Sequence, residues 1–63
     1  MNAEELRSLR DIVEVQGRDG NWNYSEYMRG IFNGMEMMLA IVEKREPKFR
    51  TEPKRYIRSS SNK

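Results

Sequence analysis

Three aromatic side chains lie close together in the sequence, at Trp22, Tyr24 and Tyr27, with Asn21 and Asn23 among them. Aromatic faces can stack on a nucleobase, while amides and the N-terminus of a helix can hold a phosphate. The same spacing also suits a hydrophobic core, in which Trp22 closes one end of a helical hairpin and the tyrosines pack inside it. The pattern therefore allows two interpretations, a ligand site or a packing cluster.

Catalytic chemistry has little support in this sequence. The chain has no His and no Cys, which removes imidazole bases, thiolate nucleophiles and nearly all zinc sites. Asp19, Asn21 and Asn23 match the first ligand positions of a calcium-binding loop. Tyr24 and Gly30, however, stand where that loop needs Gly and Glu. We therefore expect a protein that is not an enzyme and that binds no metal and no cofactor.

The chain is too small to be stabilised comfortably by its own core. It has 63 residues, of which 37% are hydrophobic and 35% are charged. A domain of this size buries only about 60% of the surface that its unfolded chain exposes, and disulfides or a structural metal usually add the missing stability. Since neither is expected here, self-association is the remaining means.

Helical periodicity predicts an all-α fold with one helix over about 3–16 and a second over about 24–45. Residues 17–21 form a dense turn signal, so the two helices should make an antiparallel hairpin. The chain then divides into a helical hairpin over 1–46 and an irregular basic tail over 47–63.

The ends of both helices can be predicted from their capping residues. Asn2 is a good N-cap for the first helix, and Glu5 completes a capping box with it. The second helix should begin near Asn23 or Ser25, with Asn23 as the possible cap. Pro47 should end it, because the residue before a proline is kept out of the helical conformation.

The second helix carries an apolar surface that is too wide for one partner helix. Its apolar side chains form one arc of roughly 220°, about twice what a surface helix needs to cover a single core. Gly30 and Gly34 lie one turn apart on one flank of this arc, where close approach of another backbone would offset their low helix propensity. We expect a homo-oligomeric helical bundle. The residues assigned to its interface are Tyr27, Gly30, Ile31, Gly34, Met35, Met38 and Ile41.

The rest of the second helix is mostly polar, and we expect its carboxylates to be solvated. The methionines of the apolar arc suit an oligomer core, and they also suit an adaptable docking face for another protein. The polar sector consists of Ser25, Glu26, Arg29, Asn33, Glu36, Ala40 and Glu43.

Charge divides the chain into an acidic body and a basic tail. Residues 1–43 carry a net charge of −4 and residues 44–63 one of +6. A basic segment with interspersed aromatic residues can hold the phosphates of nucleic acid, or it can be solvated or lie on the acidic body of a neighbouring subunit. Phe49, Tyr56 and Ile57 are spaced so that they could anchor the tail on the hairpin or on a neighbour.

No segment of the sequence suggests export or membrane insertion. Glu4 and Glu5 stand where a signal peptide carries basic residues, and no apolar segment follows them. The most apolar stretch, residues 37–42, is far shorter than the roughly 18 apolar residues of a membrane span. We expect a cytoplasmic protein without a membrane partner.

The run Asp19-Gly20-Asn21-Trp22-Asn23-Tyr24, followed by Tyr27-Met28, Gly30, Asn33-Gly34 and Glu46-Pro47-Lys48-Phe49, resembles a group of short uncharacterised bacteriophage proteins. This resemblance covers residues 17–57 and implies a phage source, with the host cytoplasm as the place of action. It does not name an activity.

The order of a short helix, an Asp-Gly-x-Trp turn and a long glycine-containing helix also looks like the hairpin of phage sponge proteins. Those proteins oligomerise and sequester cyclic-nucleotide immune signals without cleaving them. The present chain is shorter and departs from their pattern over much of the second helix. The resemblance implies that Trp22, Tyr24 and Tyr27 stack on a ligand and that Arg29, Lys44, Arg45 and Lys48 contact its phosphates.

These observations support three hypotheses. The first is a non-enzymatic phage accessory protein, a homo-oligomer that inhibits or sequesters a host protein or a nucleotide immune signal and so acts against host defence. The second is an accessory protein that binds nucleic acid through residues 44–63. The third is a structural or docking subunit whose Met-rich face meets a virion or host protein.

Overall fold

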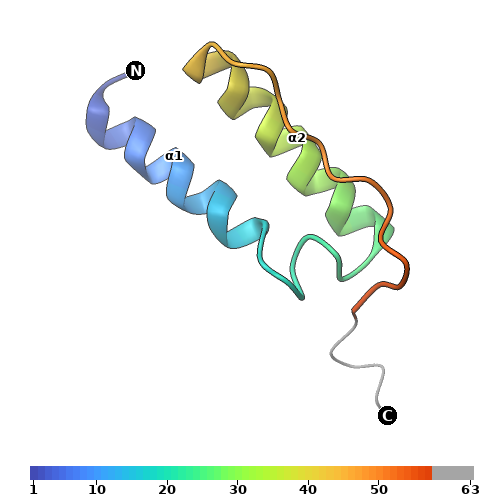
Figure 1. The fold of residues 1–63 in the computed structure, drawn as a ribbon. Coiled ribbons are helices and arrows are strands. Elements are labelled where there is room, and N and C mark those ends of the chain that lie inside the picture. Colours follow the sequence, from blue (N-terminus) through green and yellow to red (C-terminus); the bar gives the residue numbers. More distant parts are fainter. Residues whose placement is uncertain (58–63) are drawn as a thin grey trace.

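The computed structural model describes residues 1–57 and confirms the predicted all-α hairpin. Helix α1 spans Ala3–Gln16 and helix α2 spans Glu26–Glu43. The two helices run antiparallel, and the segment after α2 returns along it toward the turn (Figure 1). The end of the predicted tail, residues 58–63, lies outside the described residues.

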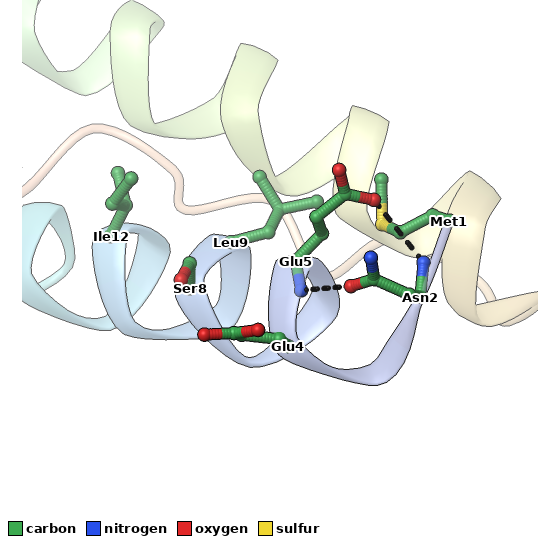
Figure 2. A pocket seen from close by; sticks show the side chains of 7 residues that line it. All are labelled: Met1, Asn2, Glu4, Glu5, Ser8, Leu9 and Ile12. Carbon is green, nitrogen blue, oxygen red and sulfur yellow. Dashed lines mark hydrogen bonds between the residues drawn. The ribbon is translucent and has the colours of Figure 1, made fainter.

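Helix α1 begins with the predicted capping box. The Oδ1 of Asn2 accepts a hydrogen bond from the backbone N–H of Glu5 at 2.7 Å, and the Glu5 carboxylate accepts one from the Asn2 backbone at 3.2 Å (Figure 2). These bonds satisfy backbone donors that have no partner within the helix. The helix ends at Gln16, directly before Gly17, as its sequence predicts.

Asn23 is part of the interhelical turn and is not the cap of α2. Its buried side chain accepts a hydrogen bond from the backbone N–H of Gly20 at 2.7 Å. Gly20 has a φ of 89°, a left-handed conformation that glycine adopts without a steric penalty. Ser25 caps α2 instead: its hydroxyl oxygen accepts a hydrogen bond from the backbone N–H of Met28 at 3.2 Å.

Helix α2 also ends earlier than predicted, and Pro47 is not what ends it. Lys44 adopts a left-handed conformation with φ 58° and ψ 48°. The backbone N–H of Arg45 then donates to the carbonyl of Ala40 at 3.0 Å, and that of Lys44 donates to Ile41 at 3.2 Å. This is the Schellman arrangement, with lysine at the position that glycine usually fills. It reverses the chain so that the tail can run back along α2.

The core is small and lies between α1 and α2, with the turn at one end of it. Its buried residues are Val13 from α1 and Phe32 and Leu39 from α2. Four partly buried side chains pack around them, namely Leu6, Leu9, Trp22 and Met35. Trp22 therefore packs against the core, which is one of the two interpretations that its position in the sequence allows.

The polar sector of α2 is covered by the tail, contrary to the expectation that its carboxylates are solvated. Glu36 is 6% exposed and Ala40 only 1%. Among the predicted anchors of the tail, Tyr56 is half-buried, whereas Phe49 and Ile57 are exposed. Polar groups, and not these apolar anchors, hold the tail on α2, because the sector of α2 that the tail meets is polar.

Helix α1 covers only one flank of the apolar arc, and the other flank is bare. Tyr27 is 76%, Met38 60% and Ile41 67% exposed. Gly30 and Gly34 are also exposed, and a Cβ at either position would meet no neighbouring atom within 4 Å. Two other residues predicted for the interface are half-buried, namely Ile31 and Met35. We call the bare flank the exposed strip; it consists of Tyr27, Gly30, Gly34, Met37, Met38 and Ile41.

Neither helix within residues 1–57 is both long enough and apolar enough to cross a bilayer.

Candidate functional site

The backbone of the tail is held by side chains of α2. The backbone N–H of Lys48 donates to Oε2 of Glu36 at 2.9 Å. Farther along, the side-chain amide of Asn33 forms two bonds with Arg50, donating to its carbonyl at 2.9 Å and accepting from its N–H at 2.8 Å. These contacts fix the path of residues 48–50, and so they determine where the side chains of Lys48 and Arg50 project.

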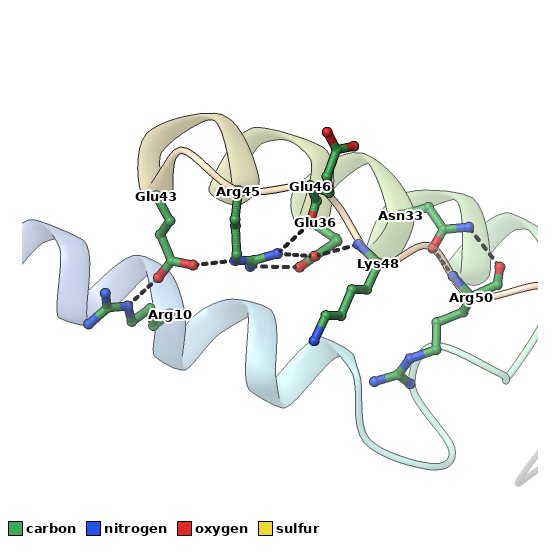
Figure 3. A network of polar contacts seen from close by, with 8 residues as sticks. All are labelled: Arg10, Asn33, Glu36, Glu43, Arg45, Glu46, Lys48 and Arg50. Carbon is green, nitrogen blue, oxygen red and sulfur yellow. Dashed lines mark hydrogen bonds and ion pairs between the residues drawn. The ribbon is translucent and has the colours of Figure 1, made fainter.

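A network of ion pairs joins both helices to the beginning of the tail (Figure 3). Arg45 donates to Glu36 at 2.6 and 3.3 Å and to Glu43 at 2.6 Å. Glu43 also pairs with Arg10 of α1. The hydrogen bond from Arg45 is the main cause that holds the pKa of Glu36 below its usual range, with the bond from Lys48 N–H adding to it. Hydrogen bonds from Arg10 and Arg45 lower the pKa of Glu43 in the same way.

Arg50 reaches from the tail across α2 toward the turn after α1. Its guanidinium carbon lies 4.5 Å from the ring centre of Phe32 and 4.9 Å from that of Trp22. Its Nη1 donates to the carbonyl of Gly17 at 2.9 Å, which ties the tail to the end of α1. This is the only hydrogen bond of the guanidinium within residues 1–57, so further N–H donors stay open to a ligand.

These side chains line a pocket of about 330 Å³, which we call the cationic pocket. Figure 3 shows Lys48 and Arg50 extending from the tail toward α1 and the turn after it. Lys48 forms no ion pair within the described part of the chain, whereas the charge of Arg45 is balanced by Glu36 and Glu43. The complete lining is Phe32, Glu36, Arg45, Lys48 and Arg50.

The arrangement is suited to an anion that carries an apolar or aromatic group. Lys48 and Arg50 supply positive charge that no carboxylate of residues 1–57 balances by an ion pair. Arginine binds phosphate and carboxylate through several N–H groups at once, while lysine acts as a point charge. The half-buried Trp22, which Arg50 contacts, adds an aromatic surface beside this opening, whereas the Phe32 ring is buried under Arg50.

A larger opening of about 540 Å³ lies along the start of α1, beside Met1, Leu9 and Ile12 (Figure 2). Its polar residues include Asn2 and Glu5, which already bond to each other as the helix cap. None of its lining side chains is a cation, so the cationic pocket is the stronger candidate. Within residues 1–57, no three His, Cys, Asp or Glu side chains gather as a metal site would require.

The structure brings some of the predicted ligand residues together and separates others. Arg45 and Lys48 both line the cationic pocket. Trp22 lies next to that pocket through its contact with Arg50. Arg29 is already engaged, because it donates to the Tyr56 hydroxyl and to the Arg50 carbonyl at 3.2 Å each. The bond to Tyr56 is the main cause that raises the pKa of Arg29.

The remaining predicted ligand residues lie elsewhere. Tyr24 is half-buried in the turn, and Tyr27 belongs to the exposed strip. Lys44 is exposed just beyond the far end of α2. At 1.5 Å per residue, Tyr27 and Lys44 are about 26 Å apart along the helix, so one small ligand does not span them in a protomer.

Three pocket residues were missed by sequence reasoning, namely Phe32, Glu36 and Arg50. Phe32 reads as core, and Arg50 is one cation among many in the tail. A signal for Glu36 does exist, because Arg29, Asn33, Glu36 and Ala40 recur at helical spacing and include a small residue. That pattern indicates a second contact face on α2, which a polar segment can cover.

Comparisons with protein-family models, with curated proteins and with solved structures found no significant match to this chain.

Proposed function

We propose that this chain is a small non-enzymatic accessory protein of a bacteriophage, which works as a homo-oligomer in the host cytoplasm. It binds a phosphate-bearing host component, of which a nucleotide immune signal is the leading case, and thereby sequesters it. The observation that carries this proposal is the cationic pocket, where Lys48 and Arg50 present positive charge next to the half-buried ring of Trp22.

The chemistry of the pocket favours a nucleotide over a bare inorganic anion. Arg50 is held between Trp22 and Phe32, so its guanidinium is oriented before any ligand arrives. A phosphate would bind to Lys48 and Arg50, and a base or sugar would then lie against the half-buried Trp22 ring next to the pocket.

The state of the one carboxylate in the pocket supports binding without catalysis. Arg45 and the backbone of Lys48 bond to Glu36 and keep its pKa low, so it is an anion at neutral pH. A general acid or base works best with a pKa near the working pH, which this arrangement opposes.

Two further observations support the other parts of the proposal. The exposed strip is the kind of apolar surface that a second copy would cover, which supports a homo-oligomer. The Asp19–Tyr24 run resembles short bacteriophage proteins, and in this fold it builds the turn between the helices.

Binding can be tested with a panel of cyclic nucleotides and ADP-ribose derivatives, measured by thermal shift and then by titration calorimetry. We expect at least one member to stabilise the protein. Lys48→Gln should weaken its binding about tenfold, whereas the matched change Lys54→Gln outside the pocket should leave it unchanged. If no member shifts the melting temperature, or if both variants bind equally well, the nucleotide proposal is wrong.

Nucleic acid is the second candidate, and a specific observation favours it. Lys54 and Arg55 are exposed on the tail and lie outside the cationic pocket. The double variant Lys54→Gln/Arg55→Gln should reduce retention of DNA or RNA at low salt, while Lys48→Gln should have the smaller effect. Truncation of the tail is a poor test, because it also removes the partners of Glu36 and Asn33.

A further inference from the structure

We infer that two copies of this chain pair through α2 in an antiparallel arrangement, with the two helices crossing at Gly34. This inference rests on the self-association proposed above and adds the surface, the direction and the register. It is carried by the exposed strip and by the charges at the two ends of α2.

The exposed strip has the spacing of a helix-pairing seam. Tyr27, Gly30, Gly34, Met37 and Ile41 recur at alternating steps of three and four residues. The strip runs along most of the 18-residue helix, and neither α1 nor the tail covers it. Because Gly30 and Gly34 have no neighbour within 4 Å in the protomer, there is room for another backbone at Gly34 and for a large side chain of a second copy at Gly30.

The sizes of the side chains select the antiparallel direction. When Gly34 faces Gly34 of the second copy, residues equally far from it on either side come opposite each other. Gly30 then lies opposite Met38, so a large side chain fills the space above a small one. Tyr27 lies opposite Ile41 in the same register. In a parallel pair, Gly30 would face Gly30 and Met38 would face Met38, which leaves a gap at one place and crowding at the other.

Charge selects the same direction. Three of the four charged residues of α2 are engaged within the protomer, namely Arg29, Glu36 and Glu43. Glu26, exposed at the start of the helix, forms no ion pair within residues 1–57, and the exposed Lys44 lies just past its other end. In the antiparallel pair, Glu26 comes within about 3 Å along the axis of Lys44 of the other copy. In a parallel pair Glu26 and Lys44 would lie at opposite ends of the two helices, so this pairing would be lost.

Disulfide trapping tests the direction of helix pairing. Because the chain has no natural Cys, only the introduced cysteines can form disulfides. A Glu26→Cys chain and a Lys44→Cys chain, one of them carrying a mass tag, are mixed and oxidised gently. Light scattering on the unmodified protein gives the native mass in a separate measurement. We expect a mass of two chains or a multiple, and a 26–44 disulfide at least fivefold more abundant than 26–26 or 44–44.

The possible outcomes separate the two proposals. A protein that stays monomeric up to millimolar concentration overturns both the self-association and the pairing. A dimer that forms mainly 26–26 and 44–44 disulfides, or none, keeps the self-association and overturns the antiparallel pairing.

Substitution at the crossing gives an independent test. Gly34→Gln places a long side chain in open space within the protomer and favours the helix, so a dilute sample should melt no lower than the wild type. The same change separates the helices in the pair and should raise the dissociation constant at least tenfold. Ser8→Gln, on the exposed face of α1, is the matched control. Equal dissociation constants for the two variants would overturn a crossing at Gly34.

Discussion

The side-chain amide of Asn33 is bonded to the backbone of Arg50 on both of its hydrogen-bonding groups. Its nitrogen donates to the Arg50 carbonyl at 2.9 Å, and its oxygen accepts from the Arg50 N–H at 2.8 Å. An amide side chain thus gives an extended segment the two bonds that a neighbouring strand would provide. This contact holds the tail in place where an apolar anchor was expected.

Asn33→Asp should therefore release this part of the tail. The substitution keeps the shape of the side chain but replaces its donor with a carboxylate oxygen facing the Arg50 carbonyl. We expect a loss of about 1–3 kcal/mol in the free energy of unfolding, measured by urea denaturation. Thr51→Asp adds the same charge to the neighbouring exposed position and should cost less than about 0.5 kcal/mol. Equal losses would mean that charge, and not the amide, causes the effect.

Acid should destabilise the protein through Glu36. Its folded pKa lies below the ordinary value of 4.5, so the stability that it contributes is present above that value and is lost as the pH falls through the folded pKa. Glu43 acts in the same direction. We expect the melting temperature to be nearly constant from pH 7 to about 5 and to fall below about 4.5.

Glu36→Gln isolates the part of this dependence that belongs to Glu36. At pH 7 the variant should lose about 1–3 kcal/mol, because the bonds from Arg45 are no longer made to a charged group. Its melting temperature should fall less steeply in acid than that of the wild type. The same steepness in both proteins would contradict the assignment.

Gly17→Ala should be destabilising although α1 has ended there. A Cβ at this position would lie 2.8 Å from the Phe32 ring and 3.2 Å from the Arg50 guanidinium. Since Phe32 is part of the packed core, its ring cannot move away freely, and we expect a loss of about 1–3 kcal/mol. Gly30→Ala, measured in dilute solution by thermal melting, should instead stabilise the protomer by about 0.5–1 kcal/mol. A stabilising effect at both glycines would show that the contact with Phe32 is not tight.

Lys44→Gly should stabilise the protein. Lys44 holds a left-handed conformation at the end of α2, which costs a residue with a Cβ about 1 kcal/mol more than glycine. We expect a gain of about 0.5–1 kcal/mol in urea denaturation of dilute samples. Lys44→Ala removes the same charge without relieving the backbone and should bring no gain. A gain for alanine as well would assign the effect to charge.

Arg50→Lys should loosen the junction of the turn, the tail and the core. Lysine keeps the positive charge, but it lacks the planar group that lies over Trp22 and Phe32 and bonds to Gly17. We expect a loss of about 1–2 kcal/mol and a red shift in the emission of Trp22, the one tryptophan of the chain. Arg55→Lys, at an exposed position, should change neither quantity.

Local signals in the sequence were enough to predict that there are two helices and where α1 begins and ends. The capping box of Asn2 and Glu5 and the end of α1 before Gly17 were predicted correctly, because residues close in sequence form both features. The ends of α2 were predicted less well. Asn23 and Ser25 can both cap a helix, and only the position of the turn decides that Asn23 bonds back to Gly20.

The cationic pocket could be predicted only in part. Arg45 and Lys48 were chosen from a resemblance, and the fold brings them to the same opening. Arg50 could not be singled out, because its role depends on rings supplied by Trp22 and Phe32, which lie far from it in the sequence. Trp22, Tyr27 and Lys44 read as one set, yet they lie at different places on the hairpin.

By itself, the sequence determined two helices, a turn and an apolar arc wider than α1 can cover, because each follows from the order of neighbouring residues and the period of a helix. Only the tertiary structure decided which flank of that arc is bare and that a polar tail covers Glu36 and Ala40. The physical reason is that long-range hydrogen bonds and ion pairs, such as those from Asn33 to Arg50 and from Glu36 to Arg45 and Lys48, hold the tail on α2. The helical spacing of Asn33, Glu36 and Ala40 can indicate a contact face on α2, but no pattern in the sequence assigns the residues of the tail to it.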